Sequence, residues 1–344
     1  MTSEPLRVLV IDDSAVVRQT LAKLLAEHGG MRVTVAADPL FALAKIRRER
    51  PDVILLDLQL PRMDGLSFLS ELMAEDPIPV VICSALTGGR SDMALTALER
   101  GAVDIVTKPK LGVKDFLHDT VISIVDIVRA AAASQPASSA ACRPRAVAPL
   151  RVRSSSARAS VVAVGASTGG TDALVRFLSR MPSDGPGLVI VQHMPQGFTA
   201  AFARRLDELC AIHVREASEG DVLEPGVALI AAGNRHLRLC ERRGQKYRVS
   251  LEDGPLVSRH RPSVDVLFHS VARTAGADAV GVIMTGMGSD GAEGLLAMRT
   301  AGATTLAQDE ASCVVFGMPR VAIERGAVQS VLPLEELPEA VLSA

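Results

Sequence analysis

The feature that most constrains the fold is an alternation of short β-rich runs with amphipathic stretches, which occurs twice along the 344 residues. In the first third, the runs rich in branched apolar residues are expected to be strands at 6–11, 32–36, 53–56, 79–83 and 104–107. Between them, apolar residues three and four apart predict helices such as 15–27 and 41–50. Strict alternation of strand and helix is typical of a parallel sheet with helices on both faces.

The same alternation resumes at residue 160. Strands are expected at 160–166, 188–192, 227–231, 280–285 and 304–307. The helical patterns between them fall at 172–180, 200–210, 264–275 and 292–301. The predicted fold class is therefore α/β, with two doubly wound parallel-sheet domains, the first flavodoxin-like and the second Rossmann-like.

A change of composition separates the two halves. Residues 129–158 are mostly Ala, Ser, Pro and Arg, with six arginines and no acid. This stretch predicts a flexible, basic linker, and a docking site for an acidic partner is the alternative. The expected domains are therefore 1–128 and 159–344, joined by the linker at 129–158.

Composition excludes several classes of protein. A net charge of −2, no Trp and a single Tyr argue against nucleic acid as a partner. The five cysteines are scattered without a C-x-x-C pair, which argues against a disulfide framework or structural zinc and favours a reducing cytosol. No apolar run approaches the roughly 18 residues that span a bilayer, so we expect a cytoplasmic protein without direct membrane insertion.

Polar side chains gather at the expected carboxyl ends of the first set of strands. Asp12 and Asp13 follow the first strand, Asp57 the third, Ser84 the fourth and Lys108 the fifth. Open parallel sheets bind ligands at this edge, and crowded carboxylates favour Mg²⁺. A carboxylate such as Asp57 can also attack phosphorus, while the Ser84 hydroxyl and Lys108 ammonium contact phosphate oxygens. A single Asp after a strand is more often a helix cap, so the prediction depends on the whole set.

Four motifs around these positions, IDDS, LLDLQLPRMDGL, CSA and VTKP, resemble those of bacterial response-regulator receiver domains over about residues 5–128. The resemblance implies that Asp57 is the phosphoacceptor and that a histidine kinase is the phosphodonor. It also implies that Asp12, Asp13 and the Gln59 carbonyl hold Mg²⁺ together with Asp57. The chain departs from the pattern at Ile105, where many receivers carry an aromatic residue that moves on phosphorylation.

A serine, a histidine and an aspartate follow strands of the second set. Ser167 comes directly after the strand at 160–166, His193 after the next strand, and Asp290 in the glycine-rich loop TGMGSDG. Serine needs a base to accept its proton, and histidine needs an orienting carboxylate. Free N–H groups of the loop 286–288 are candidates for an oxyanion hole. The three side chains therefore predict a hydrolase.

Two other interpretations of the glycine-rich corner at Ser167 remain open at this point. GASTG matches the nucleophile elbow G-x-S-x-G, but the α/β-hydrolase order would require Asp253 with His260 or His269. Dinucleotide binding is the second alternative, although the glycine spacing does not fit G-x-G-x-x-G.

Longer motifs favour one family. VGASTGG, VQHMP, HRPSVDVLF and TGMGSDGAEGL are similar to the catalytic domain of the CheB family of chemoreceptor glutamate methylesterases, over about residues 160–340. The resemblance implies that Ser167 is the nucleophile, His193 the general base and acid, Asp290 the orienting carboxylate, and the Met287 amide the oxyanion donor.

The activity that follows from the resemblance is phosphorylation-regulated hydrolysis of glutamate methyl esters on the cytoplasmic helices of methyl-accepting chemoreceptors. Deamidation of selected glutamines is expected as well, and the esterase should need no cofactor. Without phosphate, the receiver is expected to cover the active-site edge. Two alternatives stay open, a phosphorylation-dependent signalling adaptor with an idle second domain and a plain esterase for small substrates.

The segment SRHRPSVD has two interpretations. Arg259, His260 and Arg261 can line a groove for an acidic receptor helix. Alternatively, the segment is a structural loop that leads into a helix beginning near Ser263.

Overall fold

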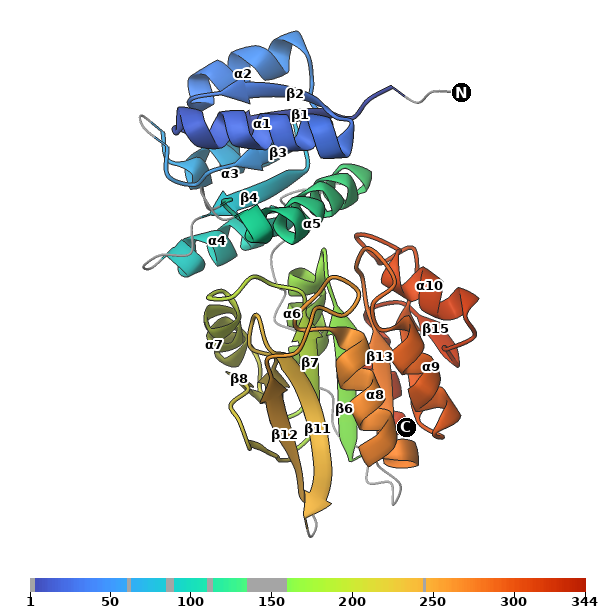
Figure 1. Cartoon of the computed structure of the whole chain (residues 1–344). Helices are drawn as coiled ribbons and strands as arrows, with labels where there is room; N and C mark the ends of the chain where they lie inside the picture. Colours follow the sequence, from blue (N-terminus) through green and yellow to red (C-terminus); the bar gives the residue numbers. More distant parts are fainter. Residues whose placement is uncertain (1–3, 61–62, 85–89, 110–113, 135–159, 244–245) are drawn as a thin grey trace. The chain divides into compact units, whose positions relative to one another are not determined.

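The computed structural model describes residues 4–60, 63–84, 90–109, 114–134, 160–243 and 246–344 (Figure 1). The chain forms two compact units, Met1–Arg143 and Pro144–Ala344, each of which is described by itself. Residues 129–133, expected to begin the linker, instead end helix α5 (Lys114–Ala133), because alanine has the highest helix propensity and Ala130 and Ala131 are buried. The rest of the predicted linker lies outside the described residues, so the linker and the domain boundaries stay predictions.

The first unit contains a parallel sheet with the strand order β2-β1-β3-β4-β5 within the described residues. The strands are β1 (Arg7–Ile11), β2 (Arg32–Ala36), β3 (Val53–Leu56), β4 (Val80–Ser84) and β5 (Asp104–Thr107). These ranges and the doubly wound topology confirm the predicted α/β fold. The order places β3 at the centre of the sheet, between the strands that end in the other predicted polar residues.

Helices complete this unit. They are α1 (Ala15–Gly29), α2 (Pro39–Arg48), α3 (Gly65–Glu75), α4 (Arg90–Glu99) and α5. Leu21 and Leu25 of α1 pack with Val125 and Val128 of α5 over alternate residues of the strands, so these two helices share one face of the sheet (Figure 1). Because the helices cover the faces of the sheet, the polar residues that follow the strands lie at its carboxyl edge, where parallel sheets bind ligands.

The second unit contains a larger parallel sheet with the order β15-β14-β13-β6-β7-β10-β8. Its strands are β6 (Val161–Ala166), β7 (Gly187–Gln192), β8 (His213–Glu216), β10 (Val227–Ile230), β13 (Ala279–Ile283), β14 (Thr304–Gln308) and β15 (Ser330–Leu332). The central strands β6, β7 and β13 are buried along their whole length, as expected of a sheet covered on both faces. The second predicted doubly wound sheet is therefore confirmed.

The helices of this unit are α6 (Gly170–Leu178), α7 (Thr199–Leu209), α8 (Val264–Thr274), α9 (Ala292–Thr300), α10 (Met318–Glu324) and α11 (Leu337–Ser343), with a 3₁₀ turn, η1, at Gly276–Asp278. Helix α8 begins after Ser263, whose hydroxyl accepts a hydrogen bond from the Val266 amide. This start agrees with the structural interpretation of the SRHRPSVD segment.

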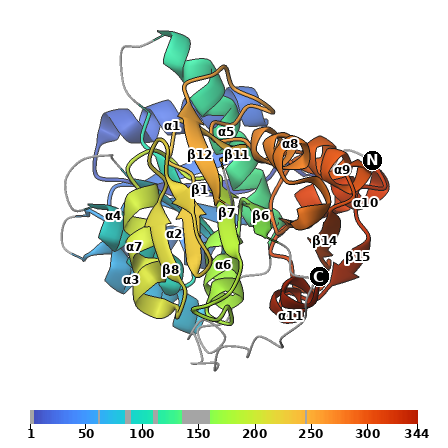
Figure 2. The same cartoon turned by 90° about the horizontal axis from the view of Figure 1, so that it is seen from below.

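A small antiparallel sheet was not predicted. Strands β9 (Val222–Leu223), β11 (His236–Arg243) and β12 (Lys246–Glu252) form it in the order β11-β12-β9, and α8 lies against β11 (Figure 2). Tyr247, Val249 and Leu251 alternate with exposed or half-exposed polar residues, and they point into the core. This period of two was the available sequence signal.

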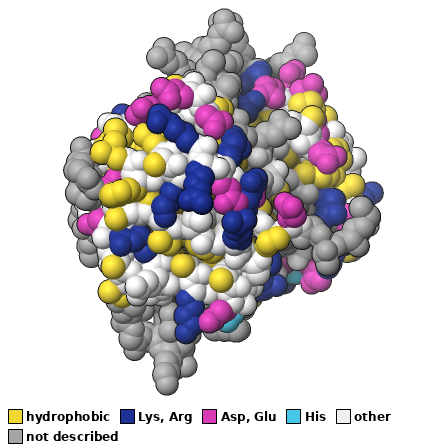
Figure 3. Space-filling model, turned by 90° about the horizontal axis from the view of Figure 1, so that it is seen from above, with side chains coloured by type: hydrophobic (Ala, Val, Ile, Leu, Met, Phe, Trp, Pro, Cys, Tyr) yellow, Lys and Arg dark blue, Asp and Glu magenta, His cyan; other side chains and the backbone are white. Residues whose placement is uncertain are grey.

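Figure 3 shows one face on which Lys and Arg side chains are interspersed with Asp and Glu. Among the residues that the structure describes, no helix is both long enough and apolar enough to span a membrane.

Candidate functional site

The carboxyl edge of the first sheet carries an acidic cluster. Asp12, Asp13 and Asp57 each offer a carboxylate oxygen, and these oxygens lie within 4.8 Å of one another. Asp12 and Asp57 are 1% and 5% exposed, whereas Asp13 is exposed. Clustered hard oxygen donors fit a divalent cation such as Mg²⁺, because the cation offsets their mutual repulsion.

Lys108 supplies the positive charge beside these acids. Its Nζ lies 2.6 Å from Asp12 Oδ2 and 2.7 Å from Asp57 Oδ2. Burial lowers the pKa of Lys108, but hydrogen bonds to both carboxylates more than offset this, so the pKa is raised and the ammonium stays charged. Burial raises the pKa of Asp57, and Lys108 counteracts only part of that effect.

The remaining predicted residues of this edge lie around Asp57. The Gln59 amide donates to Asp57 Oδ1 at 3.2 Å, and the Lys108 amide donates to the Ser84 carbonyl at 3.0 Å. Ser84 is buried at the end of β4, and Ile105 is 2% exposed within β5. The structure therefore brings the predicted phosphoacceptor, metal and phosphate-contacting residues to one edge.

Ser167 and His193 leave neighbouring strands at the same level. Ala166 of β6 pairs with Gln192 of β7, and the His193 amide donates to the Ala166 carbonyl at 3.0 Å. The Gln192 side chain joins the two turns, because its Nε2 donates to the Ser167 carbonyl at 2.9 Å and to the His193 carbonyl at 3.1 Å. Gly169 permits the corner after Ser167, since its φ of 77° is left-handed and a Cβ there would lie 2.4 Å from Val314.

Asp290 reaches the same place from the loop after β13. Its carboxylate is 1% exposed and receives hydrogen bonds from His193 Nε2 at 2.8 Å, Ser263 Oγ at 2.7 Å, and the amides of Val264 at 2.7 Å and Asp265 at 3.1 Å. It therefore lies at the N-terminus of α8, where helix amides favour a negative charge. Burial alone would raise the pKa of Asp290, but these donors lower it to about 2.

The hydrogen bond to Asp290 determines the protonation of His193. An ionised carboxylate only accepts, so Nε2 of His193 carries the proton and Nδ1 is the basic nitrogen. The side chain is 6% exposed, and Nδ1 is buried without a hydrogen-bond partner within the described residues. Because the backbone of His193 adjoins the Ser167 turn, this basic nitrogen is the candidate acceptor of the serine proton.

The glycine-rich loop approaches Ser167 directly. The Ser167 amide donates to the Thr285 carbonyl at 3.0 Å, and a Cβ on Gly286 would lie only 2.7 Å from the Ser167 Cβ. The Gly286 amide donates to Val315 at 3.0 Å, whereas the Met287 N–H donates no main-chain hydrogen bond within the described residues. An N–H without a partner next to a serine can bind a developing oxyanion.

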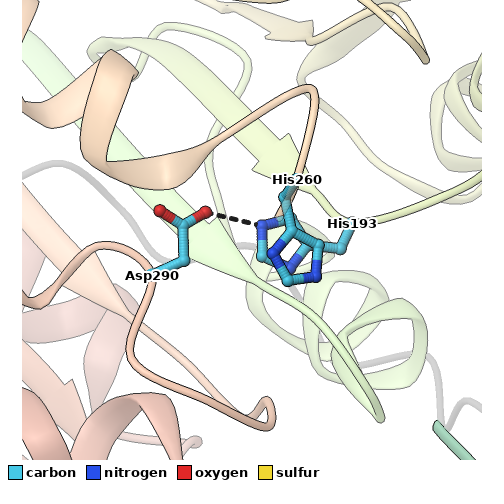
Figure 4. Close-up of side chains that lie close together, drawn as sticks. All are labelled: His193, His260 and Asp290. Carbon is cyan, nitrogen blue, oxygen red and sulfur yellow. Dashed lines mark hydrogen bonds and ion pairs between the residues drawn. The ribbon is translucent and has the colours of Figure 1, made fainter. Parts of the chain in front are cut away.

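His260 lies against His193, which the sequence did not predict. The two rings are stacked with their centroids 3.7 Å apart and their planes 4° from parallel (Figure 4). Burial and then the neighbouring His193 lower the pKa of His260 to about 3. Asp253, the alternative acid, is instead 74% exposed and paired with Arg235, which argues against an Asp253–His260 pair.

Other members of the SRHRPSVD segment have structural partners. Arg261 donates to the Asn234 side chain at 2.8 Å and to the Gly254 carbonyl, while Ser263 caps α8 and holds Asp290. The helix start near Ser263 was expected from the sequence, but its role in holding Asp290 through Ser263 and the first amides of α8 was not.

Comparison with known proteins identifies the family. Residues 162–341 match the model of the CheB methylesterase family. This chain belongs to the CheB methylesterase family. Residues 8–118 match the response regulator receiver domain, so this CheB-family chain carries a receiver ahead of the methylesterase domain.

Curated relatives match this chain over nearly its whole length and nearly their own. A protein-glutamate methylesterase/protein-glutamine glutaminase of Anaeromyxobacter dehalogenans is 56% identical over 99% of this chain and 97% of that protein. One of Geobacter metallireducens is 53% identical over 98% of both. Among solved structures, the CheB methylesterase catalytic domain of Thermotoga maritima is 36% identical, with a TM-score of 0.52, and the match covers 55% of this chain and 99% of that domain.

Proposed function

We propose that this chain hydrolyses methyl esters of glutamate side chains on the cytoplasmic helices of methyl-accepting chemoreceptors, with Ser167, His193 and Asp290 as its catalytic triad. The relatives named as protein-glutamate methylesterase/protein-glutamine glutaminase support this substrate class. The observation that carries the mechanism is the 2.8 Å hydrogen bond from His193 Nε2 to Asp290, which leaves Nδ1 as the basic nitrogen of a residue whose backbone adjoins the Ser167 turn.

Acylation comes first. Nδ1 of His193 accepts the proton of Ser167 Oγ as that oxygen attacks the ester carbonyl, and the oxyanion forms next to the Met287 N–H. The tetrahedral intermediate then expels methoxide, which takes the proton back from His193 and leaves as methanol. Asp290 stays ionised throughout, because its pKa is held at about 2, and it stabilises the imidazolium.

Deacylation repeats these steps with water. His193 accepts a proton from the water that attacks the acyl-serine, and Ser167 leaves with that proton, so the product is a free glutamate side chain. An amide differs from the ester only in its leaving group. Deamidation of receptor glutamine, with release of ammonia, is therefore a second reaction of the same site.

Phosphorylation of Asp57 by a cognate histidine kinase would control this activity. Asp57 would attack the phosphorus, and Ser84 and Lys108 would contact the oxygens of the transferred phosphoryl group. Asp12, Asp13, Asp57 and the Gln59 carbonyl are the proposed ligands of Mg²⁺, which supplies charge neutralisation for that transfer when bound.

The test is the release of labelled methanol from receptor fragments that carry methylated glutamates. The assay uses the full chain with and without Mg²⁺ and a small phosphodonor such as acetyl phosphate. We expect release that requires Ser167 and that rises with the phosphodonor, and the controls are Ser167→Ala and Asp57→Asn.

The controls separate the alternatives. Release that needs Ser167 but does not respond to the phosphodonor would retain the esterase and refute the regulatory role of Asp57. Rapid hydrolysis of small esters without release from receptor fragments would favour the plain esterase. No ester turnover with any substrate would favour the signalling adaptor.

A further inference from the structure

A tight turn holds the imidazole of His260 against that of His193. The Val257 amide donates to the His260 carbonyl at 3.1 Å and the His260 amide donates back to Val257 at 2.8 Å. Ser258 and Arg259 between them have φ angles of 49° and 65°. Two consecutive left-handed residues in a two-residue loop follow the type I′ pattern, which usually requires glycine or asparagine.

A left-handed backbone is unfavourable for non-glycine residues such as Ser258 and Arg259. Contacts with neighbouring residues must therefore stabilise this turn. One such contact fixes the ring itself, because His260 Nδ1 lies 2.7 Å from the Ser258 carbonyl and must donate to it. Arg261 anchors the chain directly after the ring through Asn234 and Gly254. The local strain thus serves to fix the position of His260.

We propose that His260 is a positioning residue for ester hydrolysis, whose flat ring fixes the plane of the His193 imidazole so that Nε2 stays on Asp290 and Nδ1 remains the nitrogen that accepts the Ser167 proton. This inference rests on the proposed function of Ser167 and His193. The stack covers one face of His193, which keeps water away from that face and restricts rotation of the ring. Parallel rings with centroids 3.7 Å apart are in van der Waals contact, so neither ring can tilt without losing that contact.

The geometry argues against two other roles for His260. Parallel rings place their nitrogens side by side rather than end to end, so His260 does not point a lone pair at the His193 nitrogens. The ligand atoms of His193, His260 and Asp290 lie within 4.8 Å of one another, as in a metal site. However, a metal binds in the plane of each imidazole, and two parallel planes cannot share one ion without rotation of a ring.

The neutral state of His260 suits a positioning role. Its pKa of about 3, lowered by burial and then by His193, keeps the ring uncharged at neutral pH. When His193 accepts the Ser167 proton, it becomes a cation against a neutral aromatic face rather than against a second positive charge.

The experiment compares His260→Phe, which keeps a flat ring, with His260→Leu and His260→Ala, which do not. Each full-length variant is assayed for methanol release and for the rate at which phenylmethanesulfonyl fluoride labels Ser167. Labelling depends on activation of the serine and needs no receptor. His213→Ala is the matched control, because the side chain of His213 is 85% exposed.

We expect His260→Ala and His260→Leu to lower kcat and the labelling rate by about tenfold or more with little change in KM, since misplacement of a catalytic group acts mainly on the chemical step. His260→Phe should recover most of that loss, to within about threefold of the parent chain. Circular dichroism verifies that each variant is folded, and His260→Leu serves as the non-planar variant if His260→Ala does not fold.

Two outcomes would overturn the proposal. If His260→Phe is as slow as His260→Leu and His260→Ala, His260 acts through its nitrogens rather than through its plane. If His260→Leu and His260→Ala are labelled as fast as the parent chain, the stack has no catalytic effect. If the parent chain labels Ser167 but releases no methanol from receptor fragments, the substrate assignment fails while the labelling comparison still decides the role of His260.

Discussion

Ser263 Oγ donates a 2.7 Å hydrogen bond to Oδ1 of Asp290, across 27 positions of the sequence. The same hydroxyl caps α8 by accepting from the Val266 amide. The first amides of α8 complete the set of donors around the carboxylate. The helix start and the orientation of Asp290 therefore depend on one another.

Replacement of Ser263 by Ala should affect both the stability of the α8 helix start and the orientation of Asp290. The variant loses a helix cap and a buried hydrogen bond, so we expect the free energy of unfolding to fall by about 1–2 kcal/mol. Activity should fall by no more than about tenfold, because the Val264 and Asp265 amides still hold Asp290. Urea unfolding and methanol release measure the two effects, with Ser179→Ala, at the half-buried C-cap of α6, as the control. Unchanged stability would mean that Ser263 is dispensable as a cap.

The stability of the second unit should depend on the charge of Asp290 at low pH. Its folded pKa of about 2 lies below the ordinary value of 3.8. A depressed carboxyl pKa stabilises the fold above the unfolded value, and this contribution, about 2 kcal/mol, is lost as the pH falls from about 4 toward 2. The difference in free energy of unfolding between the parent chain and Asp290→Asn should therefore shrink over that range.

Urea unfolding at a series of pH values measures this difference, and Asp253→Asn, at an exposed position, is the matched control. A gap between the parent chain and Asp290→Asn that stays constant from pH 5 to pH 2 would contradict the assigned pKa shift.

The sequence was sufficient to predict which strands carry functional groups at their ends. Ser167, His193 and Asp57 follow strongly apolar runs, and in a parallel sheet such positions meet at one edge. A strand buried on both faces of a sheet is an apolar run wherever it lies in the chain. Both sheets could therefore be predicted from the sequence without knowledge of the tertiary contacts.

The stacking of His260 and the anchoring of Asp290 were not predictable in this way. Both depend on a non-periodic segment, in which Ser258 and Arg259 adopt left-handed backbone that their residue types do not favour. Gly165 illustrates the same limit, because a Cβ there would lie 2.2 Å from Val264 of α8. Its need for glycine arises from a helix about one hundred residues later in the chain.

The end of α5 shows a different limit. The composition of residues 129–133, four of which are alanine, fits both a linker and a helix. Only the burial of Ala131 in the core of the first unit decides in favour of the helix.

Gln192 should be important for the relative placement of Ser167 and His193. Gln192→Leu keeps the volume but removes both donors, which leaves the His193 carbonyl without its 3.1 Å hydrogen bond. An unpaired buried carbonyl costs about 1–3 kcal/mol of stability. We also expect kcat to fall by about tenfold or more with KM nearly unchanged, because the turns that carry base and nucleophile are no longer joined.

Kinetics of methanol release and urea unfolding check this prediction. Gln329→Leu serves as the control, since Gln329 is exposed and accepts from Thr305 at the far side of the sheet. A Gln192→Leu variant with normal kcat would show that the strand pairing of β6 with β7 alone is enough to place the two residues.

Asp13 allows the proposed Mg²⁺ site to be tested without harm to the fold. It is exposed, whereas Asp12 and Asp57 are buried and paired with Lys108. Asp13→Asn should lower Mg²⁺ affinity by about tenfold, because the site loses one ligand charge. Stability without Mg²⁺ should stay the same or rise, since repulsion within the cluster decreases.

The chain has no Trp, so isothermal titration calorimetry is preferable to fluorescence for the binding measurement. Glu27→Gln, an exposed change in α1, controls for the loss of one negative charge. Equal Mg²⁺ affinity in Asp13→Asn and Glu27→Gln would exclude Asp13 from the ligand set and leave Asp12 and Asp57 as its carboxylates.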